Sequence, residues 1–283
     1  MARMTRPYAS LTDAEQVEAL RPVALDAAAA FGLEVAVLEP LLHSYNTTFS
    51  LQATDGRRFA LRLGTNSKST VAHARAQQAW VAAIAAETEV RVPEPLRGAD
   101  GEAWVLVQAP PLGREVLVTA ASWLEGDDAG ALTPESAAAL GCAMAQLHVH
   151  AAGWAPPAGA ALPEFTEPLF GDEDVLYRAP LEAEEHAVLD ETRRRGREIF
   201  ARVSAEQPLR ALHADLHGAN LKWHEGQLAV FDFDDAGMGC PRSISPSPRS
   251  TCAGRIRPSR RRCGTAMARS RRRRSSTVPT SRR

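Results

Sequence analysis

The sequence predicts an α+β protein of two lobes, with an antiparallel sheet in the first part and mainly helices in the second. Three observations support this fold class. Short strand-like segments follow one another before residue 121, segments with helical spacing flank them, and 45% of the 283 residues are hydrophobic while 24% are charged. These proportions are typical of a globular protein with a sizeable core.

A helix is expected near the start, over residues 10–31, where apolar and polar positions alternate at helical spacing. Ser10 or Thr12 would cap its first turn, because a side-chain oxygen there can accept a backbone N–H that has no partner within the helix. Gly32 would end the helix, since glycine adopts the backbone conformation that follows a last turn.

Three short strands are predicted next, over residues 35–42, 49–54 and 58–63. The Asp55-Gly56 pair supplies a hairpin turn between the last two strands, so these should pair in antiparallel fashion. The turn between the first two strands, residues 43–48, is rich in Ser, Asn and Thr. That composition is ordinary for a turn and does not by itself indicate a function.

The sheet is expected to continue after an Ala-rich amphipathic helix over residues 70–87. An extended connector with two prolines covers residues 92–96. Two further strands are predicted over residues 103–108 and 116–121, and the chain then passes through residues 122–126 into the second part.

The second part begins with a helix that starts at Thr133-Pro134 and continues to His150. Proline at the first helical position is favourable because its missing N–H would have no partner there. A loop rich in Pro, Gly and Ala extends to about Pro163, followed by an acidic stretch over residues 164–174. A charged helix is then expected over residues 181–203.

The most informative stretch is residues 213–220, with the sequence His-Ala-Asp-Leu-His-Gly-Ala-Asn. Asp215 and Asn220 can point into one cleft, where Asp215 would accept the proton of an attacking hydroxyl and Asn220 would hold Mg²⁺. Two short strands around Glu225-Gly226 would then bring Asp232 to the same cleft as the main magnesium ligand. Mg²⁺ prefers hard oxygen ligands and takes only one or two from protein, so this pattern indicates phosphoryl transfer.

The stretch from Leu212 to Gly239 resembles the phosphotransferase enzyme family, which includes aminoglycoside and choline kinases, type II homoserine kinases and bacterial stress-response Ser/Thr kinases. Eukaryotic protein kinases have Arg where this chain has Ala214, so the small-molecule branch fits better. The resemblance implies a protein-kinase-like fold that uses ATP and Mg²⁺. The acceptor would be a hydroxyl of a small molecule, such as an aminoglycoside-, homoserine- or choline-like compound, or of a protein Ser or Thr.

The resemblance also implies a domain organisation. A small nucleotide-binding lobe would cover residues 1–121 and a large catalytic lobe residues 122–241. In the family, several more helices complete the large lobe, and the sequence after Pro241 shows no counterpart of them. We therefore expect a large lobe that is incomplete at its C-terminal side.

Further site residues follow from the resemblance. The residues expected to cover the ATP phosphates are Ser44, Asn46, Thr47 and Thr48. Arg62 takes the position of the phosphate-binding lysine of kinases, and its guanidinium keeps its charge and binds phosphate in a fork. The family usually offers a Glu to pair with this cation, but this chain has Gln77, which would accept a hydrogen bond from Arg62. Backbone groups near Trp123 would contact adenine, and His213 would brace the catalytic loop.

A metal-dependent hydrolase is the alternative that the same residues permit. His213, Asp215, His217 and His224 are all suitable ligands for zinc or iron. A metal site that generates a nucleophile normally draws further ligands from distant strands, and the remaining histidines show no second cluster of that kind.

The last 42 residues, 242–283, differ in composition from the rest, with 14 Arg and no acidic residue. The rest of the chain holds 19 Lys and Arg against 34 Asp and Glu, a net charge of −15. One hypothesis is a non-enzymatic arm that binds nucleic acid without sequence specificity. Another is a shift of reading frame near codons 240–242, because the change is abrupt. Translating the downstream DNA in another frame would test it, and finding no family-like helices there would contradict it.

The expected partner is a small-molecule or protein hydroxyl acceptor, with nucleic acid bound only non-specifically through the basic segment. The acids of the 164–174 stretch favour a cationic acceptor or simply form a solvated loop. No run of eighteen apolar residues indicates a membrane span, and the N-terminus lacks the apolar region of a signal peptide, so a cytoplasmic location is expected.

Overall fold

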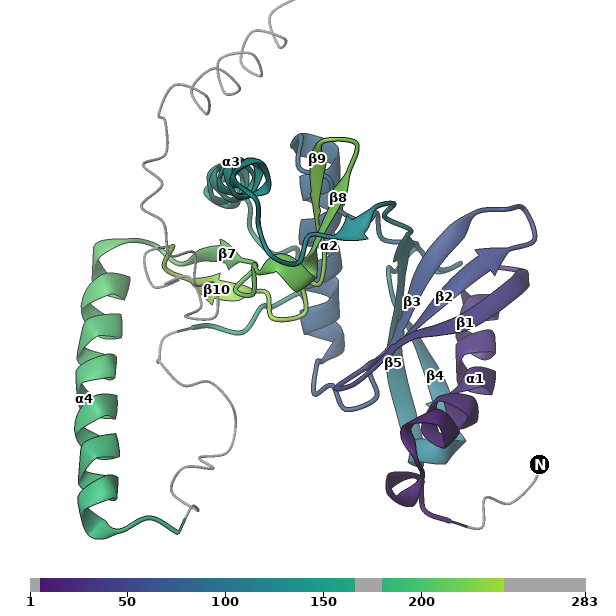
Figure 1. The fold of residues 1–283 in the computed structure, drawn as a ribbon, viewed down its shortest axis with the longest axis horizontal. Coiled ribbons are helices and arrows are strands. Elements are labelled where there is room, and N and C mark those ends of the chain that lie inside the picture. Colours follow the sequence, from purple (N-terminus) through teal and green to yellow (C-terminus); the bar gives the residue numbers. More distant parts are fainter. Residues whose placement is uncertain (1–5, 166–179, 242–283) are drawn as a thin grey trace, which may run out of the picture.

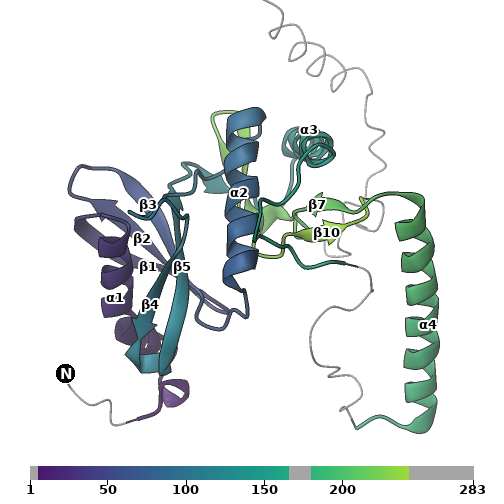
Figure 2. The same ribbon diagram turned by 180° about the vertical axis from the view of Figure 1, so that it is seen from behind.

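The computed structural model describes residues 6–165 and 180–241, and Figures 1 and 2 show its ribbon from two sides. The predictions for the acids over residues 167–174 and for the basic segment 242–283 concern residues outside this described part. The described chain forms a sheet with one helix against it and a second part that contains three further α-helices and short strands.

Helix α1 (Asp13–Ala30) begins where a reciprocal capping box forms. The Thr12 hydroxyl accepts the N–H of Glu15 at 3.4 Å, and the Glu15 carboxylate accepts the N–H of Thr12 at 2.9 Å. Of the two predicted caps, Thr12 is therefore correct. Ser10 instead ends a short 3₁₀ turn ahead of the helix. Gly32 follows the helix with φ of 72°, as expected for the residue that ends it.

The first sheet has five antiparallel strands in the order β1-β2-β3-β5-β4. The strands are β1 (Val35–His43), β2 (Thr47–Ala53), β3 (Arg58–Leu63), β4 (Val105–Ala109) and β5 (Arg114–Ser122). Five strands and the hairpin at Asp55-Gly56 agree with the prediction. The boundary of β2 does not, because Thr47 and Thr48 pair with β3 and so belong to the strand instead of the preceding turn.

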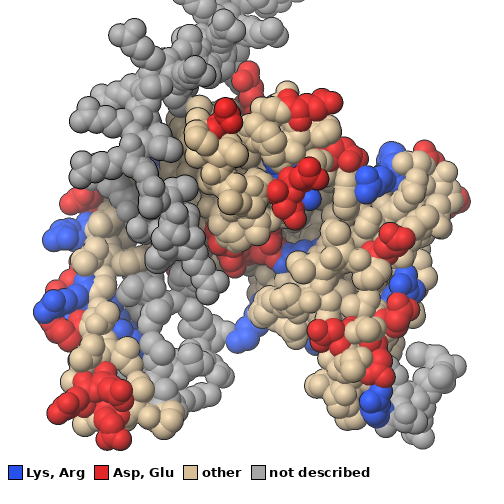
Figure 3. Space-filling model, viewed as in Figure 1, with Lys and Arg blue, Asp and Glu red and all other residues tan. Residues whose placement is uncertain are grey.

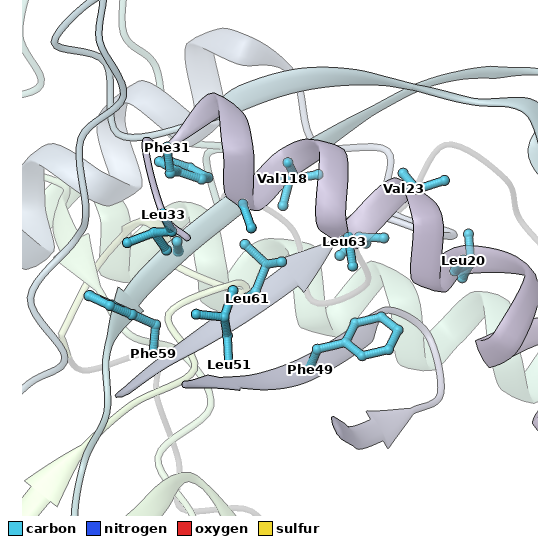
Figure 4. Packing of buried hydrophobic residues seen from close by; sticks show 14 of the residues in the cluster. Leu20, Val23, Phe31, Leu33, Phe49, Leu51, Phe59, Leu61, Leu63 and Val118 are labelled. Atoms are coloured by element: carbon cyan, nitrogen blue, oxygen red, sulfur yellow. The ribbon is translucent and has the colours of Figure 1, made fainter. Parts of the chain in front are cut away.

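One hydrophobic cluster lies between α1 and this sheet (Figure 4). Helix α1 contributes Leu20 and Val23, while Phe49 and Leu61 come from adjacent strands, and all four are at most 2% exposed. Because side chains alternate along a strand, the residues between these buried ones face the other side of the sheet. That other side faces the second part of the molecule and carries Arg62.

Helix α2 (Val71–Glu87) packs into a second hydrophobic cluster instead of the first. Its residues Trp80 and Ile84 are fully buried, together with Leu147 of helix α3 (Pro134–Ala151) and Val230 of strand β9 (Gln227–Val230). Helix α2 thus connects the sheet to the helical part. The small lobe that the family resemblance implies, residues 1–121, includes this helix.

The remaining elements complete the second part. They are β6 (Asp127–Asp128), helix α4 (Ala183–Glu206), β7 (Arg210–Leu212), β8 (Leu221–His224) and β10 (Gly237–Gly239). Strands β6, β8 and β9 form one small sheet, and β7 pairs with β10. Helix α4 stands apart from the other described elements in both ribbon views and buries none of its residues against them (Figures 1 and 2).

The last predicted strand is shorter than expected, because β9 ends at Val230 instead of Phe233. The chain leaves the strand at Asp232, whose φ of 60° is incompatible with continued pairing. Among the described residues, no helix is both long enough and apolar enough to span a membrane.

Candidate active site

The loop after β7 is tied to the segment after β9 by His213. This side chain is 3% exposed, and its Nε2 lies 2.9 Å from the Phe231 carbonyl oxygen. Its Nδ1 accepts the N–H of Asp215 at 3.3 Å, so the proton must reside on Nε2, which donates to Phe231. Burial lowers the pKa of His213, which favours this neutral form. Both ring nitrogens of His213 are therefore occupied within the protein, and they link the loop to the segment after β9.

One hydrogen bond and one close contact reach the same carboxylate oxygen of Asp215. Asn220 Nδ2 donates to Asp215 Oδ2 at 2.9 Å and also to the Asp215 carbonyl at 2.9 Å. His217 Nε2 lies 3.2 Å from Oδ2, while the Nδ1 of the same ring accepts the N–H of Ala219 at 3.2 Å. Both contacts fix the carboxylate while its second oxygen, Oδ1, has no such contact with the described residues. Asp215 and Asn220 are thus brought together, and His217 is a contributor that the sequence analysis considered only as a metal ligand.

The backbone on both sides of the site is strained. Ala214 and Asp232 have φ of 67° and 60°, in the left-handed region that side chains other than glycine rarely adopt. The surrounding packing holds these conformations, because the Phe233 ring packs at a tilt against His213, with centroids 4.5 Å apart, and meets Trp80 of α2 edge-on at 5.6 Å. Phe233 is 3% exposed, so it anchors the segment that carries Asp232.

Charged side chains of the first sheet and of the second part interact electrostatically at this site. Burial raises the pKa of Asp235, and the negative charges of Asp215 and Asp232 raise it further, while Arg62 opposes them. Burial likewise lowers the pKa of Arg62, opposed by the charges of Asp232 and Asp235. In the space-filling view, acidic and basic side chains lie side by side where the two parts meet (Figure 3). The predicted site residues Arg62, Asp215 and Asp232 therefore share one electrostatic environment.

Arg62 contacts a residue that was not among the predicted ones. Its guanidinium forms an ion pair with one carboxylate oxygen of Asp234, and the Nε2 of Gln77 donates to the other at 3.1 Å. The prediction that Gln77 would accept a hydrogen bond from Arg62 is therefore wrong in its direction, because Gln77 donates and its partner is Asp234. The three side chains line a pocket of about 160 Å³ together with Asn46.

The four residues expected around the phosphates separate into different environments. Thr47 is fully buried, and its hydroxyl lies 2.8 Å from both the Thr65 hydroxyl and His43 Nδ1, so it is engaged within the protein. Thr48 is opposite Arg62 in the β2–β3 register and therefore lies on the same face of the sheet. Asn46 lines the pocket, and its buried Oδ1 accepts no hydrogen bond from the described residues. Ser44 lies in the turn and is exposed.

Trp123 lies at the connector between the two parts, as expected, but its backbone N–H is already used. It donates to the Arg58 carbonyl at 3.1 Å, extending the pairing of β3 with β5. The Arg58 guanidinium stacks over the Trp123 ring at 4.2 Å from its centroid. Together with Glu125, these side chains line a shallow pocket of about 320 Å³.

The ligand set of the metallohydrolase alternative is not assembled. His213 is buried and bonded to backbone, and His224 lies by the β8–β9 turn, 3.9 Å from Glu225. Within residues 6–165 and 180–241, no group of three or more His, Cys, Asp or Glu side chains could hold a metal ion. An amide and a carboxylate, which suit Mg²⁺, remain available in Asn220 and Asp232.

A five-stranded antiparallel sheet, a short connector and a helical part with an Asp–Asn loop at the junction define a protein-kinase-like fold. The phosphotransferase enzyme family matches residues 37–242, and the chain belongs to this family. It is therefore a kinase with a hydroxyl group as acceptor, and the hydrolase interpretation is wrong. The match ends at residue 242, where the basic segment begins.

Solved structures agree on the fold. The amicoumacin kinase hAmiN in complex with AMP-PNP, Ca²⁺ and Ami is 18% identical with a TM-score of 0.63, and the match covers 81% of this chain and 68% of that chain. A microcompartment-associated aminopropanol kinase is 24% identical with a TM-score of 0.58, covering 78% of this chain and 71% of that chain. A search of the curated proteins found no match.

Proposed function

We propose that this chain transfers the γ-phosphoryl group of ATP to a hydroxyl group of a small amino alcohol. The observation that carries the proposal is the arrangement at Asp215, where Asn220 donates to Oδ2, His217 lies beside the same oxygen, and Oδ1 is left for the proton of the acceptor. The names of the similar kinases, which refer to amicoumacin and aminopropanol, support an amine-bearing small molecule over a protein acceptor. We also propose the division into lobes over residues 1–121 and 122–241.

In the reaction, the acceptor oxygen would form a bond to the γ-phosphorus as the bond from that phosphorus to the ADP oxygen breaks. The hydroxyl proton would pass to Asp215 Oδ1 and then to solvent. Little further covalent chemistry is needed, so the other residues act by position and charge. Arg62 would contact the phosphates from β3, with Thr48 on the same face of the sheet and Asn46 in the adjoining pocket.

The donor set fits a magnesium ion. Both hydrogen bonds of Asn220 use its amide nitrogen, which leaves the amide oxygen as a metal ligand. Asp232 supplies a carboxylate within the same electrostatic environment. When bound, Mg²⁺ would neutralise phosphate charge, and Asn220 and Asp232 are the residues that would hold it.

Thermal unfolding with and without Mg·ATP tests the nucleotide site. A ligand that binds only the folded state at 100 times its Kd stabilises it by about 2.7 kcal/mol, so the midpoint should rise by several degrees. Asp232→Ala should lose this rise, and Glu225→Gln, which changes an exposed acid at the β8–β9 turn, should keep it. A folded wild-type chain that does not respond to Mg·ATP would contradict the proposal.

Transfer of labelled γ-phosphate to a panel of amino alcohols, aminoglycosides and a Ser-containing protein then tests the acceptor. Asp215→Asn should lower kcat by about 10²- to 10⁴-fold, the usual contribution of a general base. Labelling of the protein alone would show that the small-molecule part of the proposal is wrong.

A further inference from the structure

Asp234 holds a position in the pocket that the reaction described above does not use. Its carboxylate lies between Arg62 of β3 and Gln77 of α2, with one oxygen on each. The side chains of Arg62 and Asp234 are 28% and 24% exposed, so water screens their interaction only partly. Asp234 follows Phe233, whose packing against Trp80 and His213 fixes the position of this segment.

Helix α2 cannot supply a carboxylate to Arg62. Over Val71–Glu87 its only acidic residue is Glu87, ten positions after Gln77. Ten residues of α-helix span about 15 Å, so Glu87 is far from the pocket. It lies instead 3.5 Å from His150 Nε2. The residue that α2 does present, Gln77, uses its amide nitrogen as a donor, and the acceptor opposite it is the Asp234 carboxylate.

We propose that Asp234 is a positioning residue, which orients the Arg62 guanidinium toward the phosphates of the nucleotide in place of a carboxylate on α2. This inference rests on the proposed function, because it assigns Arg62 to the phosphates. An arginine has five N–H donors in a rigid fork, so one edge can bind Asp234 while the remaining donors bind phosphate. Gln77 in turn holds Asp234, and it links the position of α2 to that of Arg62.

The arrangement predicts the direction in which two single substitutions change KM for ATP. Asp234→Asn removes a charge-assisted contact of Arg62 and should raise KM for ATP by about 10- to 100-fold. Gln77→Glu should also raise KM, because it places a second carboxylate about 3 Å from the first. If Gln77 instead contacted Arg62 directly, in the role that a Glu on this helix would have, Gln77→Glu would lower KM for ATP.

The double variant Asp234→Asn with Gln77→Glu gives the decisive comparison. It exchanges the amide and the carboxylate between the two positions, so KM for ATP should recover at least partly toward the wild-type value. Glu87→Gln, which removes the only acid of α2, should leave KM unchanged. The dependence of the rate on Mg²⁺ concentration should be the same in Asp234→Asn and wild type.

Each outcome bears on the proposal. A shift in the Mg²⁺ dependence without rescue by the double variant would overturn it and make Asp234 a metal ligand. Unchanged KM in Asp234→Asn, while the wild type responds to Mg·ATP, would overturn this inference alone. A wild type without any response would remove the proposed function and this inference with it. If Asp234→Asn does not fold, Gln77→Glu decides, since an unchanged or lower KM contradicts the role of Asp234.

Discussion

Helices α1 and α4 are both long and well capped, yet the structure uses them differently. Helix α1 buries six of its 18 residues against the first sheet, whereas α4 has 24 residues and buries none. Its apolar side chains Val188 and Ile199 are 66% and 49% exposed. Exposed ion pairs of Arg194 and Arg195 with Glu191 and Glu198 lie along its own surface.

The comparison separates local helix formation from packing. An exposed ion pair contributes between zero and about 1 kcal/mol, while each large side chain buried against the sheet contributes about 1.5–3 kcal/mol. Helix α1 should therefore unfold only with the sheet, and α4 should open independently.

The largest expected effect comes from truncating the buried face of α1. Leu20→Ala should lower the free energy of unfolding by about 2–5 kcal/mol, because the side chain is fully buried and leaves a cavity. Ile199→Ala in α4 should change it by less than about 0.5 kcal/mol. Urea denaturation of both variants measures the two losses in free energy of unfolding. Leu25→Ala is the matched control, because the Leu25 side chain lies on α1 and is 43% exposed. Equal losses for Leu20 and Ile199 would show that α4 is packed in solution.

Substitutions at the helix N-termini should also affect α1 and α4 differently, with smaller changes in stability. Thr12→Ala breaks the capping box of α1 and should cost about 1 kcal/mol of global stability, since this helix unfolds with the core. At the start of α4, the Glu185 carboxylate accepts the backbone N–H of Glu182 at 2.8 Å. Glu185→Ala should increase hydrogen exchange at the start of α4 and leave the urea midpoint unchanged. A shifted midpoint for Glu185→Ala would contradict independent opening.

The sequence predicted the order of the elements well, because capping residues and turn glycines act locally. Thr12, Thr133 and the Asp55-Gly56 turn have the roles expected from their chemistry. The spacing of Asp215 and Asn220 within one loop also indicated that they could lie together, and Asn220 donates to Asp215. These features depend on neighbours along the chain, which a single sequence displays.

Contacts between distant segments could not be predicted in the same way. Asp234 reaches Arg62 only because the left-handed turn at Asp232 and the packing of Phe233 direct the chain there. The separation of Thr47 from Thr48 depends on the register of β2 against β3, and a shift of one residue would exchange their faces. Such outcomes follow from tertiary packing, which sequence spacing does not determine.

The smallest expected effect concerns the ion pairs of α4. Hydrogen bonds from Arg194 and Arg195 lower the pKa of Glu191 from 4.5 to about 2. Because the folded value lies below the unfolded one, these contacts favour the helix fully above pH 4.5 and lose their effect as the pH falls toward 2. An NMR titration of the Glu191 carboxyl carbon should therefore have its midpoint near 2, and the double variant Arg194→Gln with Arg195→Gln should return it to the ordinary range. A wild-type midpoint in the ordinary range would mean that the pairs do not persist in water, and that α4 depends on some other contact to remain helical. Added salt should raise the midpoint, since these groups are exposed and ions screen them, whereas the stability of α1 against its sheet should not fall with salt.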